Sequence, residues 1–325
     1  MSGRRKNKKS TVLSNILLAV CIVVFVGAAG YLVLENLVKP YFNDRALEEI
    51  QKDVPGETAA SEAETEEEIQ KQDGEKAVVK VNDTVKTVRK LKETYPDMAG
   101  WIKIPSTDVH FPVVQSDLSD PEYYLYRNYK GEDTKYGSIF LDSLCSIEGD
   151  IQVLYGHSML DGRMFHCLMD FGDLEVYKKS PVIQYDTYEE AGKWKIISVF
   201  KTNTYYDQGE PFNYVISGFA DNAGKMEFVY QCMIRSMVDT GVDVADTDRL
   251  LLLSTCSYEY EGFRTVVVAR KVREGESAEV DVSKAAAAQN TLYPDVWYSQ
   301  GGTKPSWPES FSEAREQGLT PWYRP

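Results

Sequence analysis

Positive charge is scarce over most of this chain. The 325 residues contain 36 Lys and Arg against 50 Asp and Glu, which gives a formal net charge of −14. Five of the basic residues (Arg4, Arg5, Lys6, Lys8 and Lys9) lie among the first nine, so removing their charges from −14 leaves about −19 for everything beyond them. Because nucleic-acid binding rests on Lys and Arg that neutralise phosphates, the composition argues against a nucleic-acid partner.

Cysteine and histidine are also sparse, with five and three residues. Cys21 lies in an apolar run, and the other four cysteines (Cys145, Cys167, Cys232 and Cys256) are irregularly spaced without a Cys-x-x-Cys pair. Paired ligand spacing is the usual mark of a metal site, so we expect no metal and no cofactor. A domain of this length buries a core without a disulfide framework, and we expect most of these thiols to be buried, reduced and inert.

Only one apolar run is long enough to cross a membrane. Residues 10–34 contain no charged side chain, and about 20 residues suffice for a membrane-spanning helix. The basic residues 1–9 before it predict a cytoplasmic N-terminus and an exported remainder. The alternative is a cleaved signal peptide, which has a shorter apolar core and a small-residue cleavage site. Residues 27–30 are small, but apolar residues 31–34 follow directly, which favours an uncleaved anchor.

The rest of the chain divides into four parts by composition. Residues 35–80 read as an acidic, flexible stalk, because they cannot bury enough apolar surface to offset their ordering entropy. Residues 81–96 fit a helix that packs on the following domain, residues 97–274 form the catalytic domain, and residues 275–325 form an aromatic-rich extension. Large aromatic side chains are unusual in disordered tails, so we expect the last ~35 residues to pack back onto the domain.

Short β-type runs dominate the catalytic domain, and Pro, Gly, Asn and Asp clusters separate them. This pattern predicts a mainly β fold, an eight-stranded closed or partly closed antiparallel barrel, with short helices near 164–169 and at 221–237. The predicted strands are Trp101–Ile104, Val109–Val114, Ser138–Leu141, Ile151–Tyr155, Val182–Thr187, Trp194–Lys201, Leu250–Cys256 and Thr265–Val272.

Three side chains at the ends of such runs suit acyl transfer on sulfur. Cys256 ends an apolar run, as nucleophiles often do, and a thiolate is the reactive form of cysteine. His157 follows Gly156 at the end of another run and could act as general acid and base. Arg264 opens the last strand, where it could stabilise an oxyanion or hold the substrate backbone.

Each of these residues also has a simpler interpretation. Cys256 alone could be a core cysteine, and Arg264 could pair with Glu259 or Glu261. The other two histidines fit structural roles, His110 on a strand surface and His166 in a short helix.

Taken together, the motifs resemble the sortase family, and its class B subgroup most closely. The resemblance covers residues 97 to 273 in the family's order and rests on five motifs: WIKIPST (101–107), FPVVQ (111–115), YGSIFLD (136–142), LYGHSMLDGRMF (154–165), and LSTCSYE (253–259) with RTVVV (264–268). It implies a sortase-type eight-stranded β-barrel with short peripheral helices, preceded by one N-terminal transmembrane helix.

The resemblance also implies an activity. A class B sortase is a membrane-anchored cysteine transpeptidase that cuts a C-terminal sorting motif of surface proteins after Thr, forms a thioester and passes the acyl group to a cell-wall peptide amine. The family's triad falls on His157, Cys256 and Arg264, and its substrate-binding positions fall on Tyr155, Ser254 and Thr255. The expected partners are the sorting-motif peptide, the cell-wall amine and the membrane. Alternatives are a pilus-type sortase, a cysteine hydrolase of cell-wall peptides, and a non-catalytic membrane-tethered scaffold.

Overall fold

The computed structural model describes residues 8–55, 64–70, 76–299 and 301–325. The chain divides into two units, Met1–Ile50 and Gln51–Pro325. The first unit is helical: α1 (Lys8–Val33) continues through a π-helical turn, η1 (Leu34–Val38), into α2 (Lys39–Gln51). The helical stretch Val12–Gln51, 40 residues long, is a candidate membrane span by its length and composition.

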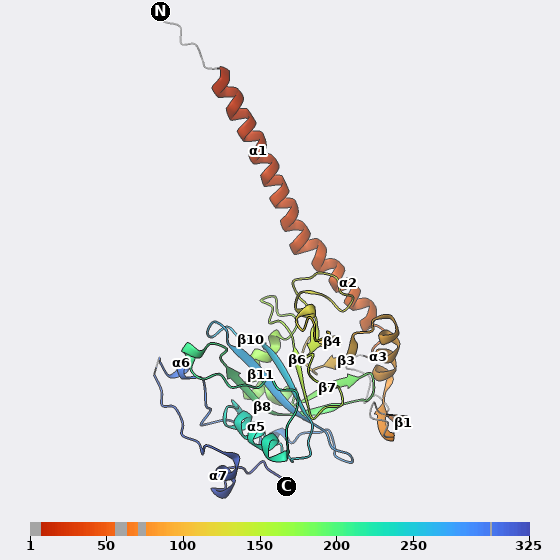
Figure 1. Cartoon of the computed structure of the whole chain (residues 1–325), viewed down its shortest axis with the longest axis vertical. Helices are drawn as coiled ribbons and strands as arrows, with labels where there is room; N and C mark the ends of the chain where they lie inside the picture. Colours follow the sequence, from red (N-terminus) through yellow and green to blue (C-terminus); the bar gives the residue numbers. More distant parts are fainter. Residues whose placement is uncertain (1–7, 56–63, 71–75, 300) are drawn as a thin grey trace, which may run out of the picture. The chain divides into compact units, whose positions relative to one another are not determined.

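The second unit is built around a closed barrel of eight strands (Figure 1). Going round the barrel, the order is β10-β11-β8-β7-β3-β4-β5-β6, and β6 pairs with β10 to close it. This confirms the predicted eight-stranded barrel, and each predicted run contributes one strand. The strands are β3 (Met98–Lys103), β4 (His110–Gln115), β5 (Ile139–Leu141), β6 (Ile151–Tyr155), β7 (Val182–Thr187), β8 (Lys193–Thr202), β10 (Leu250–Cys256) and β11 (Arg264–Lys271).

The prediction of an antiparallel barrel was wrong for two of the eight pairings. β4 pairs parallel with β5, and β6 pairs parallel with β10. Parallel neighbours need a long crossover connection, and residues 116–138 supply one between β4 and β5. The strand β10 follows β6 only after β7, β8 and the helix α5 (Asn222–Ile234), so two distant parts of the chain meet at the seam of the barrel.

The strand β10 is buried on both faces. Leu250 to Leu253 are 0% exposed, as are Val266, Val267 and Val268 of β11. A strand covered on both faces reads as a continuous apolar run rather than as an alternation, and this explains the four consecutive leucines. The buried strands give the residues at their ends a rigid base.

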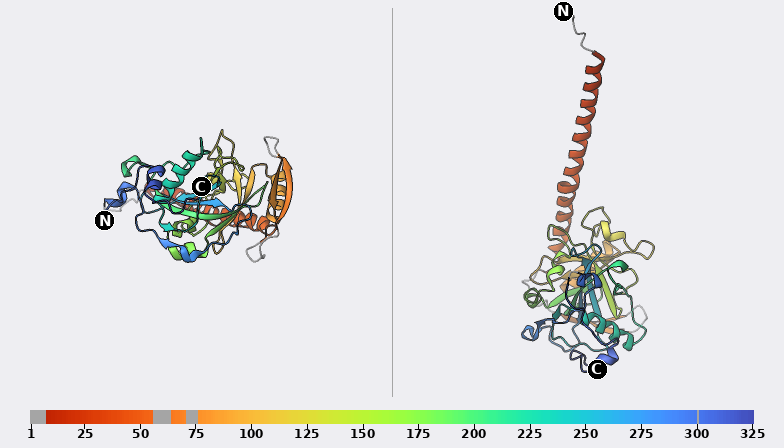
Figure 2. Two further views of the ribbon diagram at one scale, coloured as in Figure 1. Left: turned by 90° about the horizontal axis from the view of Figure 1, so that it is seen from below. Right: turned by 90° about the vertical axis from the view of Figure 1, so that its left-hand side faces the viewer.

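A two-stranded ladder occupies part of the segment expected to be a flexible stalk. The strands β1 (Thr65–Gln70) and β2 (Lys76–Val81) pair antiparallel, with Glu66 opposite Lys80 and Glu68 opposite Val78. Val79 and Val81 are buried with Val85 and Ala191. The expectation of a featureless spacer was therefore wrong for these strands, because their alternating apolar residues find a partner surface on the barrel. The rest of the expected stalk includes 56–63 and 71–75, which lie outside the described residues. Figure 2 shows the ladder (orange) at one side of the barrel.

Helix α3 (Asp83–Thr94) lies within the range predicted for a helix and contacts β3. Asn82 caps its N-terminus by accepting a hydrogen bond from the backbone N–H of Val85 at 2.9 Å, as N-cap residues do.

Most of the other elements are short. The helix expected near 164–169 is the 3₁₀ turn η3, and the helix expected over 221–237 is α5, which ends at Ile234. Beyond it the Ser236 hydroxyl donates a hydrogen bond to the Val238 carbonyl and accepts one from the Val199 N–H on β8. These two bonds turn the chain after α5. The elements outside the barrel strands, the β1–β2 ladder and the helices already described are η2 (Tyr123–Tyr126), η3 (His166–Asp170), α4 (Leu174–Lys179), η4 (Tyr206–Gln208), α5 (Asn222–Ile234), β9 (Val238–Asp239), η5 (Val282–Lys284), β12 (Ala286–Ala287), α6 (Asp295–Tyr298) and α7 (Phe311–Glu316).

The C-terminal extension, residues 275–325, packs back onto α5, as its aromatic content predicts (Figures 1 and 2). Tyr230 and Ile234 of α5 share a buried cluster with Ala314 of α7, and the rings that pack against it are Trp307, Phe311 and Trp322. The Tyr230 hydroxyl donates a hydrogen bond to the Pro308 carbonyl at 2.8 Å.

A fully buried arginine fixes the start of the extension. Arg270 on β11 is 0% exposed and forms a bidentate pair with Glu276, with both N···O distances at 2.7 Å. Asp243 and Asp248 accept from Arg273 and also lie within ion-pair distance of Arg270. The hydrogen bonds from Arg270 hold the pKa of the Glu276 carboxyl far below its ordinary value.

Candidate active site

The seam between β6 and β10 brings Cys256 and His157 to the same end of the barrel. Ser254 is the register partner of Tyr155 in this parallel pair. The Gly156 N–H donates to the Ser254 carbonyl at 3.2 Å, and the Thr255 hydroxyl donates to the Gly156 carbonyl at 2.7 Å. Cys256 and His157 each lie two residues beyond a register partner, so both project from the same edge.

Arg264 lies directly across from Cys256. The two residues are the last register partners of the antiparallel β10–β11 pair, and the loop 257–263 connects them. Cys256, His157 and Arg264 are all half-buried. The structure therefore brings the three predicted residues to one edge of three adjacent strand segments and leaves each partly accessible.

The alternative pairing of Arg264 with a glutamate was wrong. Glu259 forms its ion pair with Lys201, and the Arg264 guanidinium donates instead to the carbonyls of Gly262 at 3.3 Å and Phe263 at 3.0 Å. Within the described part of the chain no carboxylate lies within ion-pair distance of Arg264. Its charge is therefore not neutralised by an acidic neighbour.

A polar cluster beneath the loop 257–263 supports the segment that joins Cys256 to Arg264. Lys201 on β8 donates to Ser257 Oγ at 3.1 Å and Thr265 Oγ1 at 3.3 Å, and it pairs with Glu259. Burial opposes ionisation of Glu259, but the hydrogen bonds from Lys201 and Ser257 lower its pKa overall. The cluster ties the loop to β8 and β11 and so limits the movement of both ends.

His157 is oriented by a backbone carbonyl. Its Nε2 lies 2.8 Å from the Leu125 carbonyl oxygen, and its ring lies 5.4 Å from the Tyr126 ring, centroid to centroid. Because a carbonyl oxygen only accepts, Nε2 carries the proton in this hydrogen bond, and Nδ1 is the nitrogen with a free lone pair in the neutral ring. Burial lowers the pKa of His157, although the Leu125 hydrogen bond opposes the shift.

The remaining cysteines differ from Cys256 in their surroundings. All five cysteines are free of disulfides. Burial raises the pKa of Cys145 to about 11 and that of Cys167 to about 11, and it raises the pKa of the fully buried Cys232 further. These three thiols stay protonated at neutral pH, as expected for buried cysteines.

The predicted substrate-binding residues already have partners inside the protein. The Tyr155 hydroxyl donates to Asp142 Oδ2 at 2.8 Å, and burial raises its pKa. Ser254 is 3% exposed and its hydroxyl is 2.8 Å from the Tyr214 hydroxyl, while Thr255 is 2% exposed and bonded to Gly156. Tyr155 is half-buried, so it is the most accessible of the three.

Two tyrosines near the site were missed in the sequence. Burial raises the pKa of the Tyr214 hydroxyl, which interacts electrostatically with both Arg264 and Cys256. Tyr258, two residues after Cys256, donates a hydrogen bond to the Ser158 carbonyl, one residue after His157. Tyr214 lies in an irregular segment with no local signal, but the position of Tyr258 in the loop after Cys256 could have identified it.

The other two histidines have other surroundings. His110 on β4 packs edge-on against Trp101 at 5.4 Å between ring centroids. His166 Nδ1 lies 3.0 Å from the Ser158 hydroxyl and helps to hold the loop that follows His157.

Comparisons with known proteins agree with the fold. The family model of the Sortase domain matches residues 102–272, more than half of the chain. Sortase B of Listeria monocytogenes is 31% identical over 201 residues, which cover 60% of this chain and 78% of that protein. Among solved structures, sortase B from B. anthracis is similar, with a TM-score of 0.56 and 30% identity over 73% of this chain and 99% of that one. The Staphylococcus aureus sortase B–substrate complex has a TM-score of 0.53 and 27% identity, covering 59% and 87%.

The closed eight-stranded barrel, together with the match to the Sortase domain, places the chain among the cysteine transpeptidases. The chain belongs to the sortase family, and its relatives place it in the sortase B group. Enzymes of this group anchor surface proteins. The alternative of a non-catalytic scaffold is therefore not supported.

Proposed function

We propose that this transpeptidase cleaves a sorting-motif peptide of surface proteins after its Thr, with Cys256 as nucleophile, His157 as general acid and base, and Arg264 as the group that binds the developing oxyanion. The observation that carries the proposal is the register: Cys256 faces Arg264 across β10–β11, and His157 follows two residues after Tyr155, the last partner of the parallel β6–β10 pair. The substrate complex of the S. aureus relative supports a peptide partner.

In the first step the Cys256 thiol passes its proton to the neutral His157 ring as the sulfur attacks the Thr carbonyl carbon. The C–N bond to the next residue breaks, the proton on His157 goes to the departing amine, and a thioester remains. In the second step an amine of a cell-wall peptide attacks the thioester carbonyl and gives up a proton to His157. The C–S bond then breaks, and the departing sulfur takes this proton back from His157 to restore the thiol. Arg264 donates hydrogen bonds to the carbonyl oxygen as it gains negative charge in both steps.

The proposal places the reaction at the outer face of a membrane. The helical stretch Val12–Gln51 would anchor the chain, with its basic first residues in the cytoplasm and the barrel outside. Protease protection in sealed cells tests this orientation, because only an exported barrel is cut by protease added from outside.

The reaction itself is tested with the full-length chain in detergent, a library of five-residue motif peptides, and glycine or diaminopimelate as acceptor amine. Mass spectrometry should detect an acyl adduct on Cys256 and a ligated product. Cys256→Ala should abolish both, and Cys167→Ala, the same substitution at a half-buried cysteine away from the site, should retain both. Cleavage without ligation would favour a hydrolase, and turnover by Cys256→Ala would overturn the assignment of the nucleophile.

A further inference from the structure

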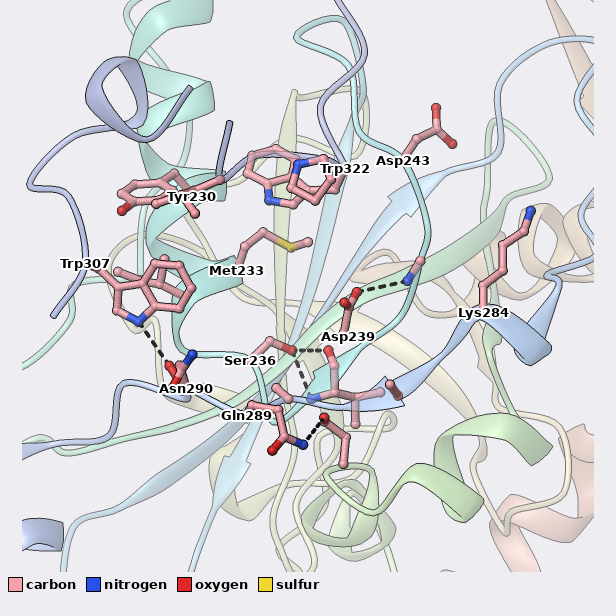
Figure 3. A pocket seen from close by; sticks show the side chains of 18 of the residues that line it. Tyr230, Met233, Ser236, Asp239, Asp243, Lys284, Gln289, Asn290, Trp307 and Trp322 are labelled. Atoms are coloured by element: carbon pink, nitrogen blue, oxygen red, sulfur yellow. Dashed lines mark hydrogen bonds between the residues drawn. The ribbon is translucent and has the colours of Figure 1, made fainter. Parts of the chain in front are cut away.

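A second cavity lies away from the proposed active site, between α5, β9 and the C-terminal extension (Figure 3). Its volume is about 580 Å³, which falls within the range of small-molecule sites. Most of its lining residues lie between 284 and 324, beyond the end of the family match at residue 272. The cavity is therefore a feature of this chain's extension rather than of the shared barrel.

Small side chains on one wall keep the cavity open. Ala286 and Ala287 form β12, which pairs with Val238–Asp239 of β9, and both alanines are exposed and line the cavity with Ala288. Protein interiors rarely leave unfilled spaces larger than a water molecule. A run of alanines opposite large aromatic rings leaves a space that a ligand can occupy.

The opposite wall is aromatic and held in place. The Trp307 indole N–H donates to the Asn290 carbonyl at 3.0 Å, which fixes the ring, and the side chain is half-buried at the cavity edge. Trp322 packs on Phe311 at 6.0 Å between ring centroids, and its backbone carbonyl accepts from the Val244 N–H at 2.8 Å. Figure 3 shows Trp307 and Trp322 around Met233 and Tyr230. These rings are pre-positioned, so binding on them requires little further ordering.

The charges around the cavity are largely matched, which argues against an anionic ligand. Lys284 is 3.4 Å from Asp281, Asp243 is paired with Arg270 and Arg273, and the Arg324 guanidinium donates to backbone carbonyls. A site for phosphate would instead present several cations without partners.

Polar groups around the aromatic wall argue against a purely apolar ligand. Among the residues that the structure describes, the Asp239 carboxylate accepts one long hydrogen bond, from the Gly241 N–H at 3.4 Å, and the Gln289 amide N–H donates to the Ala287 carbonyl while its oxygen accepts none. The Asn290 side-chain amide makes no hydrogen bond within the described residues. A ligand with both a flat apolar face and several hydroxyl groups would satisfy this combination.

We propose that the cavity binds a neutral saccharide, with the C–H face of a sugar ring against the Trp307 indole and its hydroxyl groups bonded to Asp239 and Asn290. The negative face of an aromatic ring attracts the polarised C–H groups of a sugar, and carboxylate and amide groups pair with its hydroxyls. An N-acetyl group would place its methyl against the alanines of β12. The proposal is independent of the chemistry at Cys256.

Isothermal titration of the full-length chain with the β-1,4-linked tetramer of N-acetylglucosamine tests the proposal. The detergent must carry no sugar headgroup, because a maltoside would compete for the site. Saturable binding is expected, and Trp307→Ala should weaken it at least tenfold. Ala287→Phe, which fills the cavity from the β12 wall, should abolish it, and Ala223→Phe on the exposed side of α5 should leave it unchanged.

Circular dichroism melting of each variant shows that it remains folded. No heat of binding at millimolar tetramer, equal affinity in Ala287→Phe, or displacement of the tetramer by an unrelated peptide would overturn the saccharide site. Cys256→Ala should bind the tetramer as the wild type does. A failure of acyl transfer is thereby distinguished from a failure of saccharide binding.

Discussion

The hydroxyl of Tyr258 donates a hydrogen bond to the backbone carbonyl of Ser158, a residue 100 positions earlier in the chain. Ser158 follows His157 and Tyr258 lies two residues after Cys256, so this contact joins the loops that carry the two proposed reacting groups. The Ser158 hydroxyl in turn contacts His166. The contact makes Tyr258 a positioning residue in the proposed mechanism.

Removing the Tyr258 hydroxyl should reduce the rate of acyl transfer more than substrate binding. A single hydrogen bond contributes about 1 kcal/mol net, so we expect Tyr258→Phe to lower kcat about fivefold with little change in KM. Steady-state kinetics with the peptide and amine substrates measures both constants. Tyr206→Phe, at a more exposed tyrosine, is the matched control and should leave them unchanged. An equal kcat for wild type and Tyr258→Phe would mean that the contact has no positioning role.

The four cysteines of the barrel unit should react very differently with iodoacetamide at pH 7.5. Cys145, Cys167 and Cys232 have raised pKa values because they are buried, so little thiolate forms at this pH. Cys256, half-buried at a strand end, should be alkylated first. Peptide mapping by mass spectrometry follows each site separately. Faster labelling of Cys167 than of Cys256 would contradict this prediction, and unfolding in urea should make all four react at similar rates.

The imidazole of His157 should titrate below the ordinary histidine value. Burial lowers its pKa, so the neutral ring persists as pH falls through about 6.5. NMR of ring nitrogens labelled with ¹⁵N should give a midpoint below that value, and in the neutral form the proton should reside on Nε2, which donates to the Leu125 carbonyl. A midpoint above 6.5, or a neutral ring protonated on Nδ1, would contradict the geometry.

Replacing the buried Arg270 should destabilise the whole barrel. Removing one partner of a buried ion pair leaves the other charges without compensation and costs about 3–5 kcal/mol, and Arg270 is 0% exposed beside Glu276 and Asp243. Urea unfolding followed by tryptophan fluorescence should show this loss for Arg270→Met. Arg324→Met, an exposed arginine of the extension, should change the free energy of unfolding by less than about 0.5 kcal/mol.

The same cluster should make stability depend on pH in the acid range. The folded pKa of Glu276 lies below its unfolded value, so its contribution is fully present above the unfolded value, about 4.3, and is lost as pH falls through the folded pKa. The free energy of unfolding should therefore decrease from about pH 4.3 downward. Glu276→Gln should show a smaller decrease over the same range, measured by urea titrations at pH 7, 4.5 and 3. An identical pH dependence would assign the acid sensitivity to other carboxyl groups.

Much of the barrel could be predicted because its strands carry local signals. The run Leu250–Leu253 indicated a strand buried on both faces, and a short loop from Cys256 to Arg264 implied that the two residues end a hairpin. The parallel seam was not predictable in the same way, because it pairs β6 with a strand nearly 100 residues later and depends on the order in which all eight strands assemble.

The missed features depend on tertiary contacts. Tyr214 lies in an irregular segment and meets Ser254 only because the chain before α5 folds over β10. The ladder β1–β2 was read as a solvated spacer because of its glutamates, yet Val79 and Val81 found buried partners in Val85 and Ala191. In both cases the composition of the segment describes its own polarity. It does not show which distant surface the segment will contact after folding.

The parallel seam has a consequence for when the enzyme becomes able to react during synthesis. The strand that ends beside the imidazole is complete by residue 155, whereas the strand that bears the thiol begins only at residue 250. A growing chain thus makes the histidine long before the proposed nucleophile exists, and the barrel closes only when β11, which begins at Arg264, joins β10 to β8. Closure of the barrel and assembly of the proposed site therefore arise together, late in synthesis.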